Sequence, residues 1–195
     1  MIPAVVGAAA NIGEIVIPGD TGWQLPSAAV SHTAGTGNEN WLATTNVTFI
    51  GGSDAFTNDL NYDAGGQDVS KYIRAYNFDM SAIPDGAVIS RISCRAALYK
   101  SSTNGSTPTA FFLSHDGSVQ GDASSNINLT DSETLFTRTA DAGADPLWGA
   151  GLTTAQVKSS TFGCFVGGGI SCTVYYDNII AYANYIQMKV DWVAP

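Results

Sequence analysis

The sequence predicts an all-β protein: an antiparallel, jelly-roll-like β-sandwich with an extended N-terminal arm. Apolar residues make up 45% of the 195 residues, charged residues make up 13%, and 21 residues are glycine. Such a chain has ample core material, few solvating charges and many turn formers, which is typical of many short strands. Two regularly alternating segments, 71–100 and 182–193, are the second observation that predicts this fold.

The segment 71–100 is expected to form a strand, a tight turn and a second strand. Pro84 presets a φ angle that turns need, and Gly86 accepts a positive φ. Alternation along the second strand gives it one apolar and one polar face. We expect the apolar face to consist of Val88, Ile92, Cys94, Ala96 and Leu98, and the polar face to include Arg91, Ser93 and Arg95.

The remaining strands follow from short apolar segments separated by Gly, Ser, Asn and Asp. The segment before the C-terminus alternates most regularly, because Ile186, Met188 and Val190 are each followed by a polar residue. Thr153 and Gln156 have the spacing of a capping box, which predicts one helical turn after Thr153. The expected strands are Ala43–Ile50, Lys71–Phe78, Ala87–Tyr99, Thr109–Ser114, Glu133–Arg138, Ser160–Val166, Ser171–Tyr176 and Tyr182–Val193.

The domain organisation is expected to be an arm over residues 1–37 followed by a sandwich domain over residues 38–195. Pro3, Pro18 and Pro26 interrupt the arm, yet it is too apolar for a disordered linker. We therefore expect it to be ordered by packing, either on this domain or on a neighbouring subunit. The arm residues expected to bind a partner are Ile2, Val5, Val6, Ile12, Ile15, Ile17, Trp23 and Leu25.

The charge pattern excludes two classes of partner. The formal net charge is -9, and the eight basic residues are scattered along the chain rather than clustered. Nucleic acids and anionic membrane surfaces both require a concentrated positive surface, so we expect neither as a partner. The first residues lack the basic region of a signal peptide, so synthesis in a cytoplasm without a cleaved leader is expected.

No motif in the chain predicts catalysis, so we expect no enzyme activity, no catalytic residues and no cofactor. His32 and His115 are far apart in the sequence, and neither belongs to a nucleophile or carboxylate motif. The loop 51–68 holds four aspartates, and oxygen ligands suit calcium. Their spacing does not match an EF-hand, so solvated turns are the favoured interpretation and no metal site is predicted.

Cys164 and Cys172 flank a glycine-rich stretch that is compatible with a hairpin. If Gly168 is the hairpin tip, the two cysteines face each other within reach of a disulfide. The alternative is a pair of buried free thiols. We favour free thiols, because nothing else in the chain indicates an oxidising compartment.

Aromatic residues leave a second binding function open. Trp148 and Trp192 lie in core-like patterns, whereas Trp23 and Trp41 lie in loop-like surroundings that suit a subunit contact. A platform for stacking sugars requires that some aromatic rings are exposed. Its candidates are Trp23, Trp41, Trp148, Trp192, Tyr175, Tyr176, Tyr182 and Tyr185.

Two motifs carry a resemblance to a known group of proteins. The stretch IRAYNFDMSAIPDGAVISRISCRAALYK and the later DPLWGAGLTTAQVKSSTFG resemble elements of β-sandwich structural proteins of tailed bacteriophages. The resemblance covers roughly residues 71–193 and leaves out the arm. A weaker resemblance, over 78–89, is to carbohydrate-binding-like sandwich modules of secreted proteins.

The first resemblance implies a non-enzymatic virion protein, a capsid decoration (cement) protein or a tail-associated one. It implies that the protein lies on the capsid surface after synthesis in the host cytoplasm. The implied partners are the major capsid protein or other virion subunits, together with further copies of the chain in a homotrimer. The second resemblance implies the alternative, a glycan-binding module of a phage receptor-binding protein or of a secreted adhesin.

Overall fold

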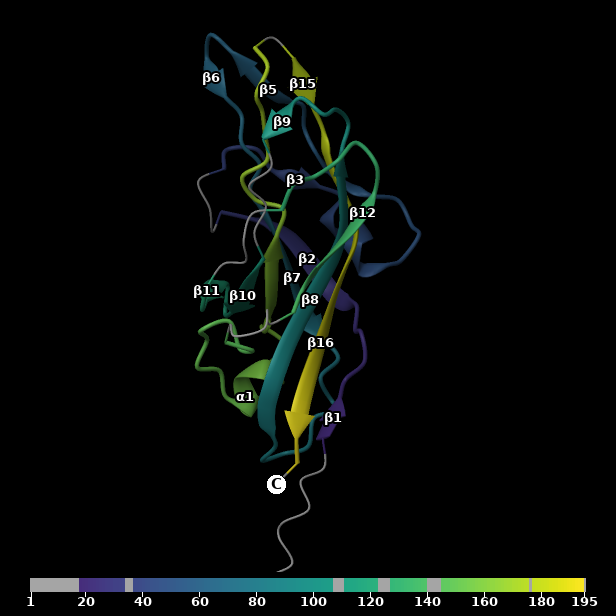
Figure 1. The fold of residues 1–195 in the computed structure, drawn as a ribbon, viewed down its shortest axis with the longest axis vertical. Helices are drawn as coiled ribbons and strands as arrows, with labels where there is room; N and C mark the ends of the chain where they lie inside the picture. The colour runs from purple at the N-terminus through teal and green to yellow at the C-terminus, as the bar shows by residue number, and fades with distance from the viewer. Residues whose placement is uncertain are drawn as a thin grey trace, which may run out of the picture.

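A computed structural model describes residues 18–33, 37–106, 111–122, 127–139, 145–175 and 177–194. Two antiparallel sheets face each other in the middle of the molecule (Figure 1). The first sheet consists of β1 (Pro18–Asp20), β3 (Trp41–Leu42), β4 (Ala55–Thr57), β8 (Val88–Lys100), β12 (Thr134–Arg138) and β16 (Ala181–Val193). The second sheet consists of β2 (Pro26–His32), β7 (Tyr72–Phe78), β10 (Phe112–His115), β11 (Ser118–Gln120) and β13 (Gly163–Val166).

Short elements complete the fold at its two ends. Small strands lie together at the upper end of Figure 1, while β1 and the C-terminal end of β16 lie at the lower end. The small strands are β5 (Leu60–Asp63), β6 (Gly66–Gln67), β9 (Gly105–Ser106), β14 (Ser171–Cys172) and β15 (Asn178–Ile179). The helical elements are the 3-10 helix η1 (Thr44–Thr48) and the single turn α1 (Thr154–Val157).

Strand order places the two longest strands in the middle of the first sheet. Its order is β12-β8-β16-β4-β3, with β1 also paired to β16, and the second sheet has the order β11-β10-β13-β7-β2. Ile92 and Met188 from the first sheet and Ile73, Leu113 and Val166 from the second all belong to one buried core. The all-β antiparallel sandwich is therefore confirmed, whereas jelly-roll-like connectivity stays a prediction.

Several local predictions are confirmed. Gly86 has a φ of 78°, and the N–H of Ala87 donates to the carbonyl of Pro84 at 3.2 Å, which closes the expected turn. Thr153 caps α1, and its capping box with Gln156 is complete. These elements were predictable because each depends on residues that are close in the sequence.

The two strands expected within 71–100 are β7 and β8, and they belong to different sheets, so the turn between them crosses the sandwich. Two other local predictions are wrong. Val88 is exposed and Ile89 is buried instead, because a register shift near Asp191 leaves Ser90 without a partner and reverses the alternation. The expected strand Ala43–Ile50 is the helix η1, which begins after Ala43 with a positive φ of 50°.

The expected arm is only partly separate from the sandwich. β1 pairs with the end of β16, and β2 pairs with β7 over six residue positions. Residues 18–33 therefore contribute strands to both sheets, and a boundary at residue 37 does not separate them from the sandwich. The rest of the expected arm, residues 1–17, lies outside the described residues.

Candidate binding surface

Only two of the predicted partner-binding arm residues lie in the described part of the chain. Trp23 and Leu25 are both partly buried, and the guanidinium of Arg95 lies over the indole ring of Trp23 at 4.2 Å. Leu25 lines an open pocket of about 500 Å³ beside the end of β7. Both side chains thus already contact the sandwich. The other six, which are Ile2, Val5, Val6, Ile12, Ile15 and Ile17, lie outside the described residues.

An apolar row crosses four strands on the outer face of the first sheet. Leu42 of β3 pairs with Phe56 of β4, Phe56 pairs with Tyr182 of β16, and Tyr182 pairs with Tyr99 of β8. Their sequence neighbours Trp41, Ala55, Ala183 and Leu98 are buried in the core. Because side chains alternate along a strand, the four paired residues point outward. We call Leu42, Phe56, Tyr99 and Tyr182 the outer row.

The tyrosine half of the outer row is rigidly arranged. The rings of Tyr99 and Tyr182 are stacked, with centroids 4.6 Å apart and planes 11° apart. The hydroxyl of Tyr99 donates a hydrogen bond to the carboxylate of Asp54. Burial, followed by that hydrogen bond and the negative charge of Asp54, raises the pKa of Tyr99. Tyr99 therefore stays neutral and is held in place by its stacking and its hydrogen bond.

The apolar half of the row is exposed and has apolar neighbours. Leu42 and Phe56 are each 38% exposed, and the adjoining loop carries Phe49 and Ile50, which are 65% and 59% exposed. The N–H of Gly51 in that loop donates to the side-chain oxygen of Asn184 on β16 at 3.2 Å. This hydrogen bond joins the loop to β16, the strand that carries Tyr182 of the outer row. Exposed apolar patches mark interaction surfaces.

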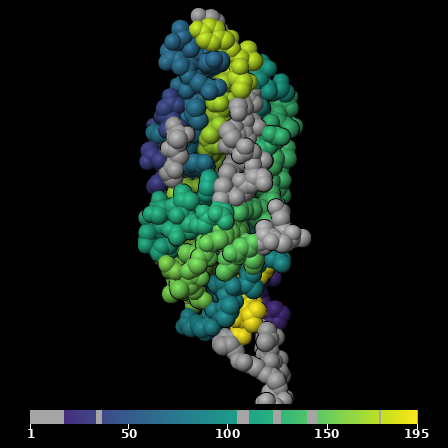
Figure 2. All heavy atoms as spheres, turned by 60° about the vertical axis from the view of Figure 1, so that its left-hand side comes forward, coloured from purple at the N-terminus to yellow at the C-terminus, as the bar shows by residue number. Residues whose placement is uncertain are grey.

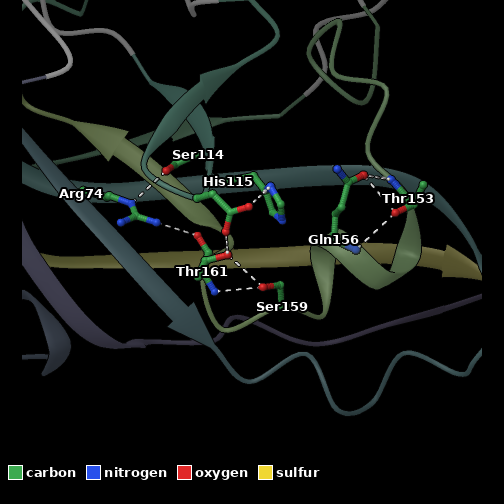
Figure 3. Close-up of polar contacts among 8 residues, drawn as sticks. Arg74, Ser114, His115, Thr153, Gln156, Ser159 and Thr161 are labelled. Carbon is green, nitrogen blue, oxygen red and sulfur yellow. Dashed lines mark hydrogen bonds and ion pairs between the residues drawn. The ribbon is translucent and has the colours of Figure 1, made fainter.

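The second sheet carries a polar network on its outer face (Figure 3). Arg74 donates to the hydroxyl of Ser114 at 3.0 Å and to the carbonyl of Thr161 at 2.8 Å. The hydroxyl of Thr161 donates to the carboxylate of Asp116 at 2.5 Å, and that carboxylate lies 3.3 Å from Nδ1 of His115. The network therefore joins β7, β10 and the segment before β13. His115 takes part in it, although the sequence shows no motif around this residue.

His32 lies near the same network, which brings both histidines of the chain to one face. Its ring packs against Phe165 with the centroids 5.0 Å apart, beside Arg74 and the turn at Gly117. Burial, followed by the positive charge of Arg74, lowers the pKa of His32. Protonation of this side chain therefore costs more in the folded protein than in the unfolded chain.

Acid is expected to destabilise the protein through His32. Because its folded pKa is below the unfolded value of 6.5, the unfolded chain binds more protons between these two values. The free energy of unfolding should fall as the pH drops through about 6.5. Urea denaturation at several pH values will show a smaller fall for His32→Gln than for the unchanged protein. Equal falls for both proteins would contradict this assignment.

The aspartates of the loop 51–68 do not converge on one point. Asp54 accepts from Tyr99, Asp63 accepts from the N–H of Gly65 at 2.7 Å, and Asp68 accepts from Asn38 at 2.8 Å. Among the residues with described positions, no three His, Cys, Asp or Glu side chains are placed to hold a metal ion. Asp63 forms the kind of local turn that the sequence favoured over a calcium site.

The prediction that Cys164 and Cys172 lie opposite each other in a hairpin is wrong. Cys164 on β13 pairs with Leu113 and Ala75, whereas Cys172 on β14 pairs with Gly105. Positive φ angles of 80° at Gly167 and 77° at Gly169 turn the chain away from a hairpin after β13. The thiols of Cys94, Cys164 and Cys172 are all free and buried.

The candidate aromatic platform is dispersed. Trp41 and Trp148 are buried, and Tyr176 lies outside the described residues. Tyr175 is exposed, and its ring lies edge-on to Tyr62 with the centroids 5.3 Å apart. Tyr62 belongs to β5 and Tyr175 follows β14, and these two segments lie at the upper end of the molecule (Figure 2).

Comparisons with known proteins give no match. No protein-family model, curated protein or solved structure matches this chain. Within the ranges that the structure describes, no helix has the length and apolar character needed to cross a membrane. A functional interpretation therefore depends on the outer row, the polar network and the motifs of the sequence.

Proposed function

We propose that this chain is a non-enzymatic structural protein of a tailed-phage virion, a capsid decoration (cement) protein. The outer row is the observation that carries the proposal. Leu42 and Phe56 are exposed apolar side chains on the outer face of a sheet whose other face packs on the core, and the loop before β4 adds the exposed Phe49 and Ile50. We propose that this surface binds the major capsid protein or another virion subunit.

The packing of the resemblance motifs supports the virion interpretation. Lys158, just after α1, donates to the carbonyl of Ile83 at 3.0 Å and to the carboxylate of Asp85 at 2.6 Å. Thr154 donates to the carbonyl of Ala87, and the indole of Trp148 donates to the carbonyl of Ile92 at 3.0 Å. The two motifs thus build one contiguous unit at the α1 end of the sandwich (Figure 1), as expected of elements that belong together.

The proposed mechanism is physical attachment rather than chemistry. Binding removes the apolar side chains beside the outer row from water, which is favourable in proportion to the area buried. The segment 1–17 adds further apolar residues, and attachment of several linked copies adds avidity. A homotrimer on the capsid surface would supply such linked copies, and sedimentation equilibrium measures its mass.

Deletion of residues 1–17 is expected to weaken binding to empty capsids by at least about tenfold. The deletion must end at Ile17, because removal through Gly37 would also remove β1 and β2 from the sheets. Binding isotherms with empty capsids of the same phage measure the effect, and urea denaturation checks that the sandwich stays folded. Unchanged capsid affinity would remove the arm from this mechanism.

The glycan-binding alternative is favoured by one observation, the exposed pair of Tyr62 and Tyr175. These two residues are 37% and 46% exposed, and exposed aromatic rings are suited to stacking on sugars. A glycan array probed with the unchanged chain and with Tyr175→Ala distinguishes the two functions. Glycan binding that is lost in Tyr175→Ala supports the alternative, whereas the capsid proposal expects no glycan signal.

A further inference from the structure

The thiols of Cys94 and Cys164 are in contact between the two sheets of the sandwich. Cys94 lies on β8 between Arg138 of β12 and Met188 of β16, so it occupies an inner strand of the first sheet. Cys164 occupies the central strand of the second sheet. Both side chains are fully buried, and the thiol of Cys94 donates to the sulfur of Cys164 across 3.2 Å.

We propose that Cys94 and Cys164 are a site of disulfide formation that links the two sheets. The inference is independent of the proposed function. Its reactant is a low-molecular-weight disulfide such as oxidised glutathione. The thiolate of one cysteine attacks the reagent, forming a mixed disulfide and releasing one glutathione thiolate. The second cysteine, after losing its proton, attacks the protein sulfur of that mixed disulfide and releases the other glutathione.

Bonds and electrons balance in this reaction. Two S–H bonds of the protein and one S–S bond of the reagent break, while one S–S bond of the protein and two S–H bonds of glutathione form. The protein thiols are oxidised by two electrons, and the reagent is reduced by the same two. Neither a metal nor a further oxidant is required.

Burial determines when the reaction happens. Desolvation, followed by the hydrogen bond to Cys164, raises the pKa of the Cys94 thiol, so the folded protein holds it protonated. Because the thiolate is the reacting species, exchange is slow in the folded protein. We therefore expect the bond to form while the chain folds or opens, and to be shielded from reductants afterwards.

The third cysteine is not positioned to compete. Cys172 is also buried, but its sulfur contacts the carbonyl oxygens of Val174 at 3.3 Å and Asn104 at 3.8 Å. It lies on β14, which pairs with β9 outside both main sheets. The geometry therefore selects Cys94, and not Cys172, as the partner of Cys164.

Peptide mapping tests this selection. The protein is unfolded in urea and refolded in a mixture of reduced and oxidised glutathione, which gives the reagent access to every thiol. Trypsin then cuts after Arg and Lys, so Cys94 falls in the peptide 92–95, while Cys164 and Cys172 share the peptide 159–189. A bond from Cys94 joins the two peptides, whereas a bond between Cys164 and Cys172 stays within the second.

The proposal expects joined peptides in the unchanged protein and equally in Cys172→Ala, in which only Cys94 and Cys164 remain. A bond within 159–189, a bond from Cys94 that disappears in Cys172→Ala, or thiols that stay free would each overturn it. The linked protein should also unfold at a temperature higher by on the order of 10 °C than protein refolded in dithiothreitol, because the bond closes a loop of roughly 70 residues. An unchanged unfolding temperature would count against a cross-sheet link.

Discussion

The double variant Leu42→Asp with Phe56→Asp is expected to lose at least about tenfold of its affinity for empty capsids while remaining folded. Both side chains are 38% exposed, so the new carboxylates stay hydrated in the free protein. In the complex they would be desolvated against an apolar partner, which is costly for a charged group. Binding isotherms with capsids measure the loss.

A matched control uses an exposed apolar residue of the other sheet. Val119 on β11 is 41% exposed, so Val119→Asp adds one carboxylate, as each single substitution of the outer row does, at a similar exposure in the other sheet. We expect this variant to bind capsids as the unchanged protein does. Equal losses in both variants would show that charge alone, rather than the outer row, determines binding.

The second large effect is expected from Trp148→Ala, which should lower the free energy of unfolding by about 3–5 kcal/mol. The indole is 1% exposed, and its N–H donates to the carbonyl of Ile92 at 3.0 Å. The guanidinium of Arg138 lies 3.9 Å from the centre of a ring of this indole. The substitution leaves a cavity, an unpaired carbonyl and a cation without its aromatic partner. Urea denaturation measures the change.

Trp148→Phe separates packing from hydrogen bonding. Phenylalanine keeps much of the apolar volume but cannot donate to the carbonyl of Ile92, so a loss of about 1–3 kcal/mol is expected. A loss in Trp148→Ala no larger than that in Trp148→Phe would mean that the ring contributes little through packing. In that case the motif around Trp148 would not stabilise the sandwich as described.

Periodicity predicted the long strands and their core faces. The core residues alternate from Ile92 to Leu98 on β8 and from Ile186 to Val190 on β16. Residues of the other face are buried as well, namely Ser93, Ala97 and Gln187. The capping box of α1 was equally predictable, because both of its partners lie within four residues. Both features depend only on residues that are close together in the sequence, so they can be recognised without knowledge of the fold.

Features that depend on distant strands were not predictable. The outer row unites residues 42, 56, 99 and 182, and alternation reveals the face of a residue but not its neighbours across the sheet. The contact between Cys94 and Cys164 depends in the same way on how two sheets stack. A hairpin tip at Gly168 would have placed Cys172 opposite Cys164, but the positive φ angles at Gly167 and Gly169 turn the chain away from a hairpin.

Photocrosslinking at the outer row tests the central claim most directly. Benzoylphenylalanine replaces Phe56 in one protein and Val119 in another, and each is irradiated on empty capsids of the same phage. The binding surface described above predicts that position 56 crosslinks to a capsid protein and that position 119 does not. Crosslinking from position 119 with none from position 56 would contradict the assignment of the outer row as the surface that binds the virion.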